Sequence, residues 1–300
     1  MKSNVRATLE DGFTIAEMLV SLLILVPLIG AVVGLFSVAV NQHGSEQSSV
    51  EANQDARSGL EMMTMEIAQA GSHGDRSTTT TSAITASIDP QAVSVASSSG
   101  FTIGDYVDLD SGANKEIVEV SAVGTDSISG VSRIAHAASA PIRLFALPYL
   151  TGVIPPAGLG ADSSATVTRL KFFGDIDGDG NVYYVEYDYD KANAQITRSM
   201  TPITQASMNP ALPLVRNVKS DSVQFTLYTD SQNVVTSVSL ALTVQNTWVT
   251  GSKYQETELS SRIVIPSGVA GSALLKELQT YGGVNRLPLT PPQVTTWANR

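Results

Sequence analysis

The hydrophobic residues of this chain are concentrated in one uninterrupted run near its start. The segment Phe13–Val40 holds 28 residues, of which only Glu17 is charged. As a helix it would extend about 42 Å at 1.5 Å per residue. A bilayer core of about 30 Å requires about 20 residues, so the pattern predicts a membrane-spanning helix.

Basic residues near this run indicate its orientation. Lys2 and Arg6 precede the apolar segment, and the next basic residue after it is Arg57. Because positively charged flanks remain in the cytoplasm, the sequence predicts a single-pass protein with a cytoplasmic N-terminus and the bulk of the chain outside.

A second apolar pattern follows in a polar background. Small and aliphatic residues recur at spacings of four, three, four and three: Ala56, Leu60, Met63, Ile67 and Ala70. That spacing places them on one face of a helix. The sequence therefore predicts that the helix continues to about Gly71 with its stripe against a sheet. Pro27 is expected to kink or loosen the membrane half.

The remaining patterns alternate as β-strands do. Phe101–Phe145 has short alternating runs separated by glycine-containing turns, and longer alternating runs begin at Val167. The Ser/Thr-rich stretch Arg76–Gly100 indicates a loop or weak strands. We predict an α+β fold, in which a long N-terminal helix packs on an antiparallel sheet with an inserted β-rich subdomain. The predicted divisions are 1–12 (leader), 13–40 (membrane helix), 41–71 (amphipathic helix), 72–155 (loop and inserted subdomain), 156–268 (β head) and 269–300 (a tail with a short helix at Ser272–Tyr281 and an irregular end).

Composition excludes several functional classes. The net charge of −10, the pI of about 4.7 and the absence of a basic stripe argue against nucleic-acid binding. The chain has no cysteine, so it has neither disulfides nor thiolate sites. Its histidines, His43, His73 and His136, are far apart, and we expect His136 to be a packing or turn residue. No nucleophile elbow or phosphate loop is present, which favours a non-enzymatic protein.

The position of Glu17 within the apolar run needs an explanation, because an unpaired carboxylate in a membrane is costly. A secretory signal peptide cleaved after Ala39 is one alternative, but the run is too long for one and Glu17 has no role there. A plain membrane anchor is a second alternative, and it leaves Glu17 without a partner.

The stretch Gly12-Phe13-Thr14-Ile15-Ala16-Glu17 resembles the processing site of type IV prepilins and pseudopilins. The resemblance implies that a prepilin peptidase cleaves between Gly12 and Phe13 and that Phe13 becomes N-methylated. Glu17 is the fifth residue after that cut. Its carboxylate would pair with the new Phe13 amine of a neighbouring subunit and fix the register between helices.

The segment Asp55–Gly71 is also similar to the region after the anchor in PilW-like minor pilins. This resemblance implies a structural or priming subunit of a type IV pilus. Its partners would be other pilin subunits and the peptidase. It would lie first in the inner (cytoplasmic) membrane and then in a filament. The alternatives are a J-class minor pseudopilin of type II secretion, or an anchored extracytoplasmic adhesin that binds through the inserted β unit or an acidic loop.

That acidic loop is Asp175–Glu186. Its oxygen-bearing residues follow the spacing of a calcium loop: Asp175, Asp177, Asp179, Asn181 and Glu186. Strand-like flanks exclude an EF-hand fold. The sequence leaves two alternatives, a calcium-binding hairpin turn and a solvated Asp-Gly turn. No cofactor is required in the second case.

Overall fold

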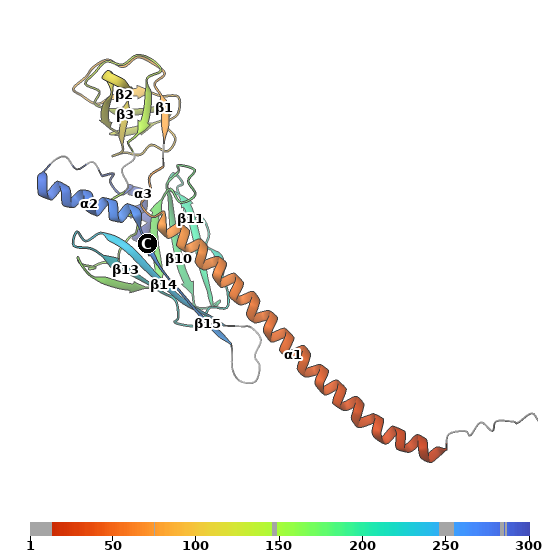
Figure 1. The fold of residues 1–300 in the computed structure, drawn as a ribbon. Helices are drawn as coiled ribbons and strands as arrows, with labels where there is room; N and C mark the ends of the chain where they lie inside the picture. The colour runs from red at the N-terminus through yellow and green to blue at the C-terminus, as the bar shows by residue number, and fades with distance from the viewer. Residues whose placement is uncertain (1–13, 75, 146–148, 246–254, 283–284, 286) are drawn as a thin grey trace, which may run out of the picture. The chain divides into compact units, whose positions relative to one another are not determined.

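The computed structural model describes residues 14–74, 76–145, 149–245, 255–282, 285 and 287–300. The chain forms two compact units. One comprises Met1–Glu51 with Asn246–Gln255, and the other comprises Ala52–Gln245 with Glu256–Arg300. Helix α1 (Ile15–Ala68) contributes residues to both units (Figure 1).

In the smaller unit, α1 presents apolar side chains on all sides. Every residue from 14 to 43 is exposed, and the helix is long and apolar enough to span a membrane. α1 is one continuous helix through Pro27, so the helix does not end there, and the predicted local kink or loosening stays a prediction. Proline removes one backbone N–H, and the intact turns on either side preserve the helix in an apolar run of this length.

In the larger unit, the predicted apolar stripe of α1 is confirmed. Ala56, Met63, Ile67 and Ala70 are fully buried, and Leu60 packs against the same core. The stripe meets aromatic and aliphatic side chains from the strands, among them Phe172, Tyr187 and Phe225. The four-and-three spacing therefore buries one continuous face of the helix.

Two antiparallel sheets of four strands supply the rest of this core. One has the order β12-β11-β10-β9 and the other β15-β14-β13-β8. Their strands are β8 (Ser164–Val167), β9 (Arg169–Gly174), β10 (Tyr183–Asp190), β11 (Gln195–Pro202), β12 (Leu212–Val215), β13 (Gln224–Thr229), β14 (Val235–Gln245) and β15 (Glu256–Val264). A single residue separates β8 from β9, so the chain passes there from one sheet to the other.

One ion pair connects α1 to the first of these sheets. The guanidinium of Arg198 on β11 donates to both carboxylate oxygens of Glu66, at 3.0 Å from Nε and 2.6 Å from Nη2. The hydroxyl of Tyr187 on β10 donates to the same carboxylate. Because the Glu66 side chain is only 12% exposed, these donors satisfy a largely desolvated charge.

The inserted segment forms a small barrel with its own core. Its strands are β1 (Ser77–Thr79), β2 (Gln91–Ser94), β3 (Tyr106–Leu109), β4 (Glu116–Glu119), β5 (Ala122–Gly124), β6 (Ser127–Gly130) and β7 (Pro141–Leu144), with a short 3-10 helix η1 (Gly112–Asn114). They form sheets in the orders β1-β7-β3-β4 and β2-β6-β5. At one pair of sheet edges the chain runs from β4 directly into β5. At the other pair, an antiparallel β-bridge between Thr80 and Val95 joins the two sheets. The sheets thereby close around apolar side chains that include Phe101 and Ile128.

The C-terminal part of the chain is more helical than predicted. α2 (Pro266–Tyr281) begins six residues before the expected Ser272, and the end expected to be irregular contains α3 (Pro292–Ala298). Proline starts both helices, where its fixed φ and missing N–H are tolerated. Trp297 of α3 is fully buried beside Tyr184, which explains why this short helix is held in place.

Candidate functional site

The first predicted site is at the start of α1, where Glu17 is described and Gly12 and Phe13 lie outside the described residues. Thr14 and Glu17 form a reciprocal pair of hydrogen bonds. The Thr14 backbone N–H and hydroxyl donate to Glu17 Oε2 at 2.9 and 3.0 Å, and the Glu17 N–H donates to Thr14 Oγ1 at 3.3 Å. This is a capping box, with Thr14 before the helix and Glu17 in its first turn.

The capping box gives Glu17 a second role, which we did not predict. The Thr-x-x-Glu spacing that signals it is present in the sequence, within the same residues that resemble a prepilin site. One carboxylate oxygen, Oε2, accepts both bonds from Thr14. The carboxylate is therefore held at the helix start by its own chain, close to where a new amine would be created at Phe13.

The second predicted site is the turn between β9 and β10. One oxygen from each of Asp175, Asp177 and Asp179 lies within 4.8 Å of the others. Asp175 is buried and accepts the Gly180 N–H at 3.1 Å, while the other two carboxylates are exposed. The strands on both sides are those that the sequence predicted, so the loop is a hairpin turn and not an EF-hand.

Of the other two predicted calcium ligands, Glu186 does not join these three carboxylates, whereas the side-chain amide of Asn181 donates to Asp179 Oδ2 at 2.7 Å. Glu186 lies on β10, where its Oε1 accepts the Tyr184 hydroxyl at 2.7 Å, and it is outside the carboxylate group. The side-chain oxygen of Asn181 accepts Arg76 Nη2 at 2.7 Å. Because Glu186 lies on an extended strand, it is displaced from the turn, and sequence spacing alone does not predict that displacement.

Arg76 places a positive charge at this loop, which sequence reasoning missed. In addition to its bond to Asn181, its Nε donates to the Gly180 carbonyl at 2.5 Å. Arg76 immediately precedes β1, so its side chain connects the start of the barrel to the acidic turn. More than 100 residues separate the two partners, so no local signal could reveal the contact.

The electrostatics of the turn reflect crowded carboxylates. Burial, and then the nearby charges of Asp179 and Asp177, raise the pKa of Asp175. Burial and a hydrogen bond to Asp179 raise the pKa of Tyr183 to about 12. Bringing a divalent cation to these oxygens would relieve the repulsion between them.

We therefore predict that calcium stabilises the protein. A ligand that binds only the folded state at a hundred times its Kd adds about 2.7 kcal/mol to the free energy of unfolding. The expected result is a rise in melting temperature on adding Ca²⁺, reversed by a chelator. The matched variant is Asp177→Asn, which removes one exposed carboxylate and should abolish the Ca²⁺-dependent rise in melting temperature. If the melting temperature does not change when Ca²⁺ is added, the loop is a solvated Asp-Gly turn and not a calcium site.

A buried histidine cluster lies in the barrel. The ring of His136 has no exposed side-chain area, and its two nitrogens face two carboxylates: Nδ1 is 3.0 Å from Asp110 Oδ2 and Nε2 is 2.9 Å from Glu116 Oε1. Glu116 also accepts the Ser132 hydroxyl and the Arg133 N–H. His136 is thus buried, as expected of a packing residue, and it is also an ionic centre.

The charge state of this cluster follows from its geometry. Ionised carboxylates can only accept, so when Asp110 and Glu116 are both ionised the two ring nitrogens both donate and His136 is an imidazolium. Burial opposes that charge, but the hydrogen bonds to Asp110 and Glu116 outweigh it and raise the pKa of His136. The hydrogen bond to His136 lowers the pKa of Asp110.

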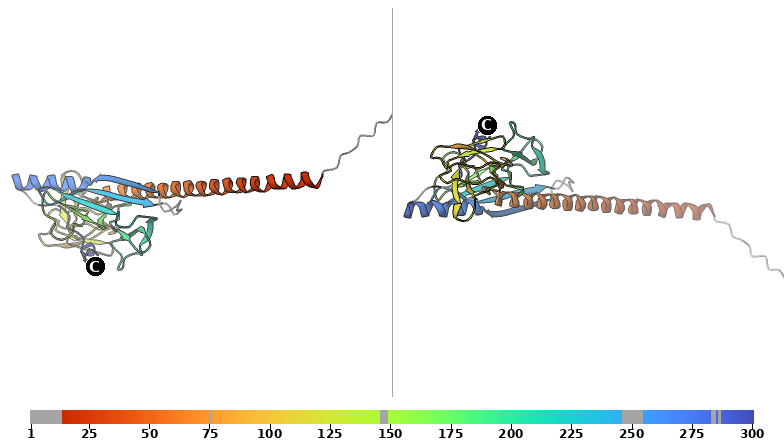
Figure 2. Two further views of the ribbon diagram at one scale, coloured as in Figure 1. Left: turned by 90° about the horizontal axis from the view of Figure 1, so that it is seen from below. Right: turned by 90° about the horizontal axis from the view of Figure 1, so that it is seen from above.

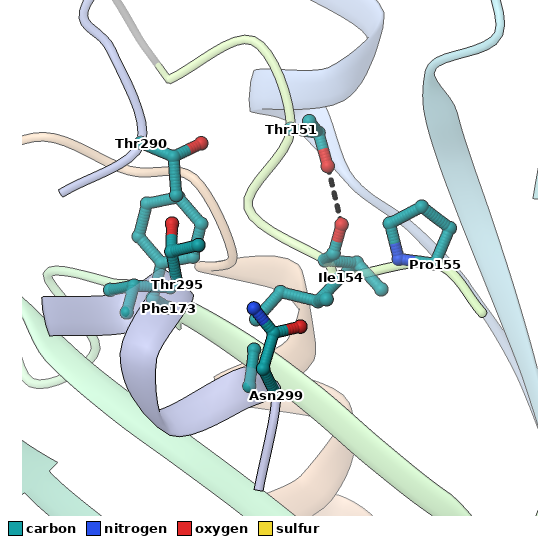
Figure 3. A pocket seen from close by; sticks show the side chains of 10 residues that line it. Thr151, Ile154, Pro155, Phe173, Thr290, Thr295 and Asn299 are labelled. Carbon is teal, nitrogen blue, oxygen red and sulfur yellow. Dashed lines mark hydrogen bonds between the residues drawn. The ribbon is translucent and has the colours of Figure 1, made fainter. Parts of the chain in front are cut away.

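A separate pocket of about 180 Å³ lies beside α3 (Figure 3). Its walls are apolar or neutral: Thr151, Val153, Ile154, Pro155, Phe173, Thr290, Val294, Thr295, Ala298 and Asn299. The Thr151 hydroxyl donates to the Val153 carbonyl within it. None of the lining side chains is ionisable, so this pocket offers packing and neutral hydrogen bonds only.

Comparison with known proteins gives no further assignment, since no family model, curated protein or solved structure matches the chain.

Proposed function

We propose that this protein is a structural subunit of a type IV pilus, of the minor pilin kind, processed by a prepilin peptidase and assembled through α1. It acts without catalysis, and its partners are other pilin subunits. The observation that carries the proposal is the sequence Gly12-Phe13-Thr14-Ile15-Ala16-Glu17 at the start of an apolar helix that could span a membrane. The α+β arrangement of this helix and the antiparallel sheets is compatible with such a subunit.

In this proposal the chain is held in the cytoplasmic membrane before assembly. Cleavage after Gly12 leaves a positive amine on Phe13, and the Glu17 carboxylate of a neighbouring subunit neutralises it. In hydrocarbon an unpaired charge is expensive, so only the register that pairs the two groups is favoured. The capping box supports this step, because Thr14 occupies Glu17 Oε2 and leaves Oε1 with no partner among the described residues.

The first experiment replaces Gly12. A larger residue, as in Gly12→Leu, is expected to block cleavage, so the protein should keep its leader. Mass spectrometry of the protein from native membranes measures this directly, and wild-type protein should begin at Phe13. A wild-type chain that retains its first twelve residues would refute the processing step.

The second experiment replaces Glu17. Glu17→Ala is expected to be cleaved normally and to remain in the membrane, because the missing carboxylate leaves the neighbour's amine unpaired. The measurement is the fraction of the protein found in sheared filaments. Thr14→Val serves as the matched variant, since it disrupts the capping box but retains the carboxylate. Wild-type incorporation of Glu17→Ala would exclude the register function.

A type II secretion pseudopilin of the J class is the second candidate, and it shares the anchor and the β-rich head, whereas the similarity of Asp55–Gly71 to PilW-like minor pilins supports only the first. An anchored adhesin is the third, with the barrel as the part that would bind. The barrel has a core of its own, separate from the core beneath α1, which is what a binding module on an anchored subunit requires. Sheared filaments distinguish a filament subunit from an anchored adhesin, which should be absent from them.

A further inference from the structure

A groove of about 720 Å³ lies on the surface of the barrel. That volume is within the range of ligand-binding pockets, which is about 300–1,000 Å³. In the right-hand view of Figure 2, no helix crosses in front of the yellow barrel strands. The residues that line the groove come from β3, from β4 and from the loops beside them: Ile88, Pro90, Tyr106, Ile117, Glu119, Ser121, Val131 and Arg133.

The groove exposes apolar side chains that the barrel core does not cover. Ile88 is 87% exposed, a larger fraction than that of Ile15 in the apolar part of α1, which is 82% exposed. Ile117 on β4 is also exposed, whereas Val118 beside it is buried in the barrel. Exposed apolar side chains that gather at one concave site mark a surface for binding. The walls of the groove are therefore suited to an occupant that covers them.

Hydrogen bonds hold the two loops that form one wall of the groove. The Ser87 N–H donates to the Ser132 carbonyl at 2.7 Å, which connects the loop that carries Ile88 to the loop that carries Arg133. The Arg133 N–H donates to Glu116 Oε2 at 3.0 Å, which connects the second loop to β4. A site whose walls are already fixed loses little conformational entropy when it binds.

Two opposite charges line the groove, and neither has a partner. Among the described residues, the Glu119 carboxylate and the Arg133 guanidinium form no hydrogen bond and no ion pair. Tyr106 is directly opposite Glu119 in the β3–β4 register, so the ring and the carboxylate are neighbours on one face. A carboxylate beside an aromatic ring attracts a cation, and a guanidinium attracts an anion. The groove therefore has one end for each sign of charge.

The backbone sets the distance between these two ends. Arg133 is hydrogen-bonded to Glu116, so it lies beside the start of β4. Glu119 is three residues further along the same strand, which corresponds to about 10 Å. Ile117 lies between them on the outward face of β4. The groove therefore fits a ligand with a positive and a negative group about 10 Å apart and an apolar surface between them.

A peptide in the polyproline II conformation has this pattern of groups. It has three residues per turn and a rise of about 3.1 Å, so residues i and i+3 lie on the same side of the chain, about 9 Å apart. In a β-strand the same two residues would point to opposite sides. Apolar grooves that contain aromatic residues bind such peptides, because the polyproline II chain is already extended and loses little entropy.

We propose that this groove binds an extended segment of another protein in the polyproline II conformation, with a basic residue and an acidic residue three positions apart. The basic side chain pairs with Glu119 beside the Tyr106 ring, and the acidic side chain pairs with Arg133. Two prolines between them cover Ile88 and Ile117. The proposal goes beyond the filament function and does not depend on it, because the groove belongs to the barrel alone.

The test titrates the full-length protein in detergent with fluorescent peptides of equal length. The matched peptide has Lys-Pro-Pro-Glu at its centre. Three control peptides replace its Lys and Glu by two glutamines, by two lysines or by two glutamates. We expect the matched peptide to bind about tenfold more tightly than each control, because only the matched peptide forms both ion pairs. Equal binding of the matched and the glutamine peptide, or no binding of either, would overturn the proposal.

Charge reversal in the protein tests which residues the peptide contacts. Glu119→Arg gives the groove two positive charges, so the preference should move to the peptide with two glutamates. Arg133→Glu should move it to the peptide with two lysines. Glu61→Arg is the matched control, because it makes the same change in net charge at an exposed position on α1 and should leave the preference unchanged. A preference that Glu119→Arg does not alter would refute the pairing.

Ile88→Ser tests the apolar wall without disturbing the barrel core, because the Ile88 side chain is almost fully exposed. It should lower the affinity for the matched peptide by about fivefold or more at an unchanged melting temperature. Ile103→Ser is the matched control, since Ile103 is also exposed and does not line the groove. Equal affinity of Ile88→Ser and wild type would place the peptide elsewhere and overturn the proposal. None of these titrations depends on leader cleavage, so they test the groove separately from the proposed function.

Discussion

Glu66→Ala is expected to lower the free energy of unfolding by about 2–3 kcal/mol. Removing one partner of a buried ion pair costs about 3–5 kcal/mol, and the expected loss lies at or below the bottom of that range because the Arg198 side chain is 27% exposed. The substitution leaves the Arg198 guanidinium and the Tyr187 hydroxyl without the carboxylate that both now contact. For a domain of this size the melting temperature should fall by roughly 5–10 °C, measured by thermal unfolding followed by circular dichroism.

Two control experiments separate the effect of losing the ion pair from the effect of the alanine substitution on helix propensity. Glu61 lies on α1 five residues earlier and is exposed, so Glu61→Ala should change stability by less than about 0.5 kcal/mol. A double-mutant cycle with Arg198→Ala isolates the coupling between the two charges. If Glu66→Ala and Glu61→Ala have the same effect, Glu66 does not connect α1 to the sheet.

The sequence predicted those features that depend on local periodicity. The four-and-three spacing from Ala56 to Ala70 identified the buried face of α1, because burial of a helix face requires that spacing. Alternation identified the strands on both sides of the acidic turn. At Pro27 the helix continues, because the apolar turns on either side of the proline can absorb the local cost of its missing N–H.

The contacts that complete each candidate site depend on residues far apart in the chain. Arg76 reaches Gly180, and Glu66 reaches Arg198, across more than 100 residues, and no local pattern encodes such pairs. At the acidic turn the sequence identified three carboxylates that do lie together. It also suggested Glu186, which the strand direction removes from the group. The position of a ligand therefore depends on the backbone path as well as on spacing.

The capping box is a different kind of omission, because its signal was local and readable. Thr14 and Glu17 have the required spacing, but the resemblance to prepilins already gave Glu17 a role. Two roles for one carboxylate are compatible, since its two oxygens can accept from different donors. The structure thus adds a reason, internal to the subunit, for a carboxylate at this position.

The stability of the barrel is expected to depend on pH through His136. Its pKa is raised in the folded protein, so its stabilising contribution is fully present below the ordinary value of about 6.5. The contribution is lost as pH rises through the folded-state pKa. The pKa values of Asp110 and Glu116 are lowered, so their contribution is present above about pH 4 and is lost as pH falls. The cluster should therefore stabilise the protein most between about pH 4.5 and 6.5.

The measurement is the difference in free energy of unfolding between wild type and His136→Gln across that pH range. Glutamine cannot supply a positive charge between the carboxylates, so Asp110 and Glu116 would repel each other in the variant. We expect His136→Gln to be less stable by about 2–4 kcal/mol near pH 5.5, and by progressively less as pH rises above 7. His43→Gln is the matched control, because His43 is exposed on α1 and should show no such difference. A constant difference from pH 5 to 9 would mean that His136 stabilises the barrel by packing and not by charge.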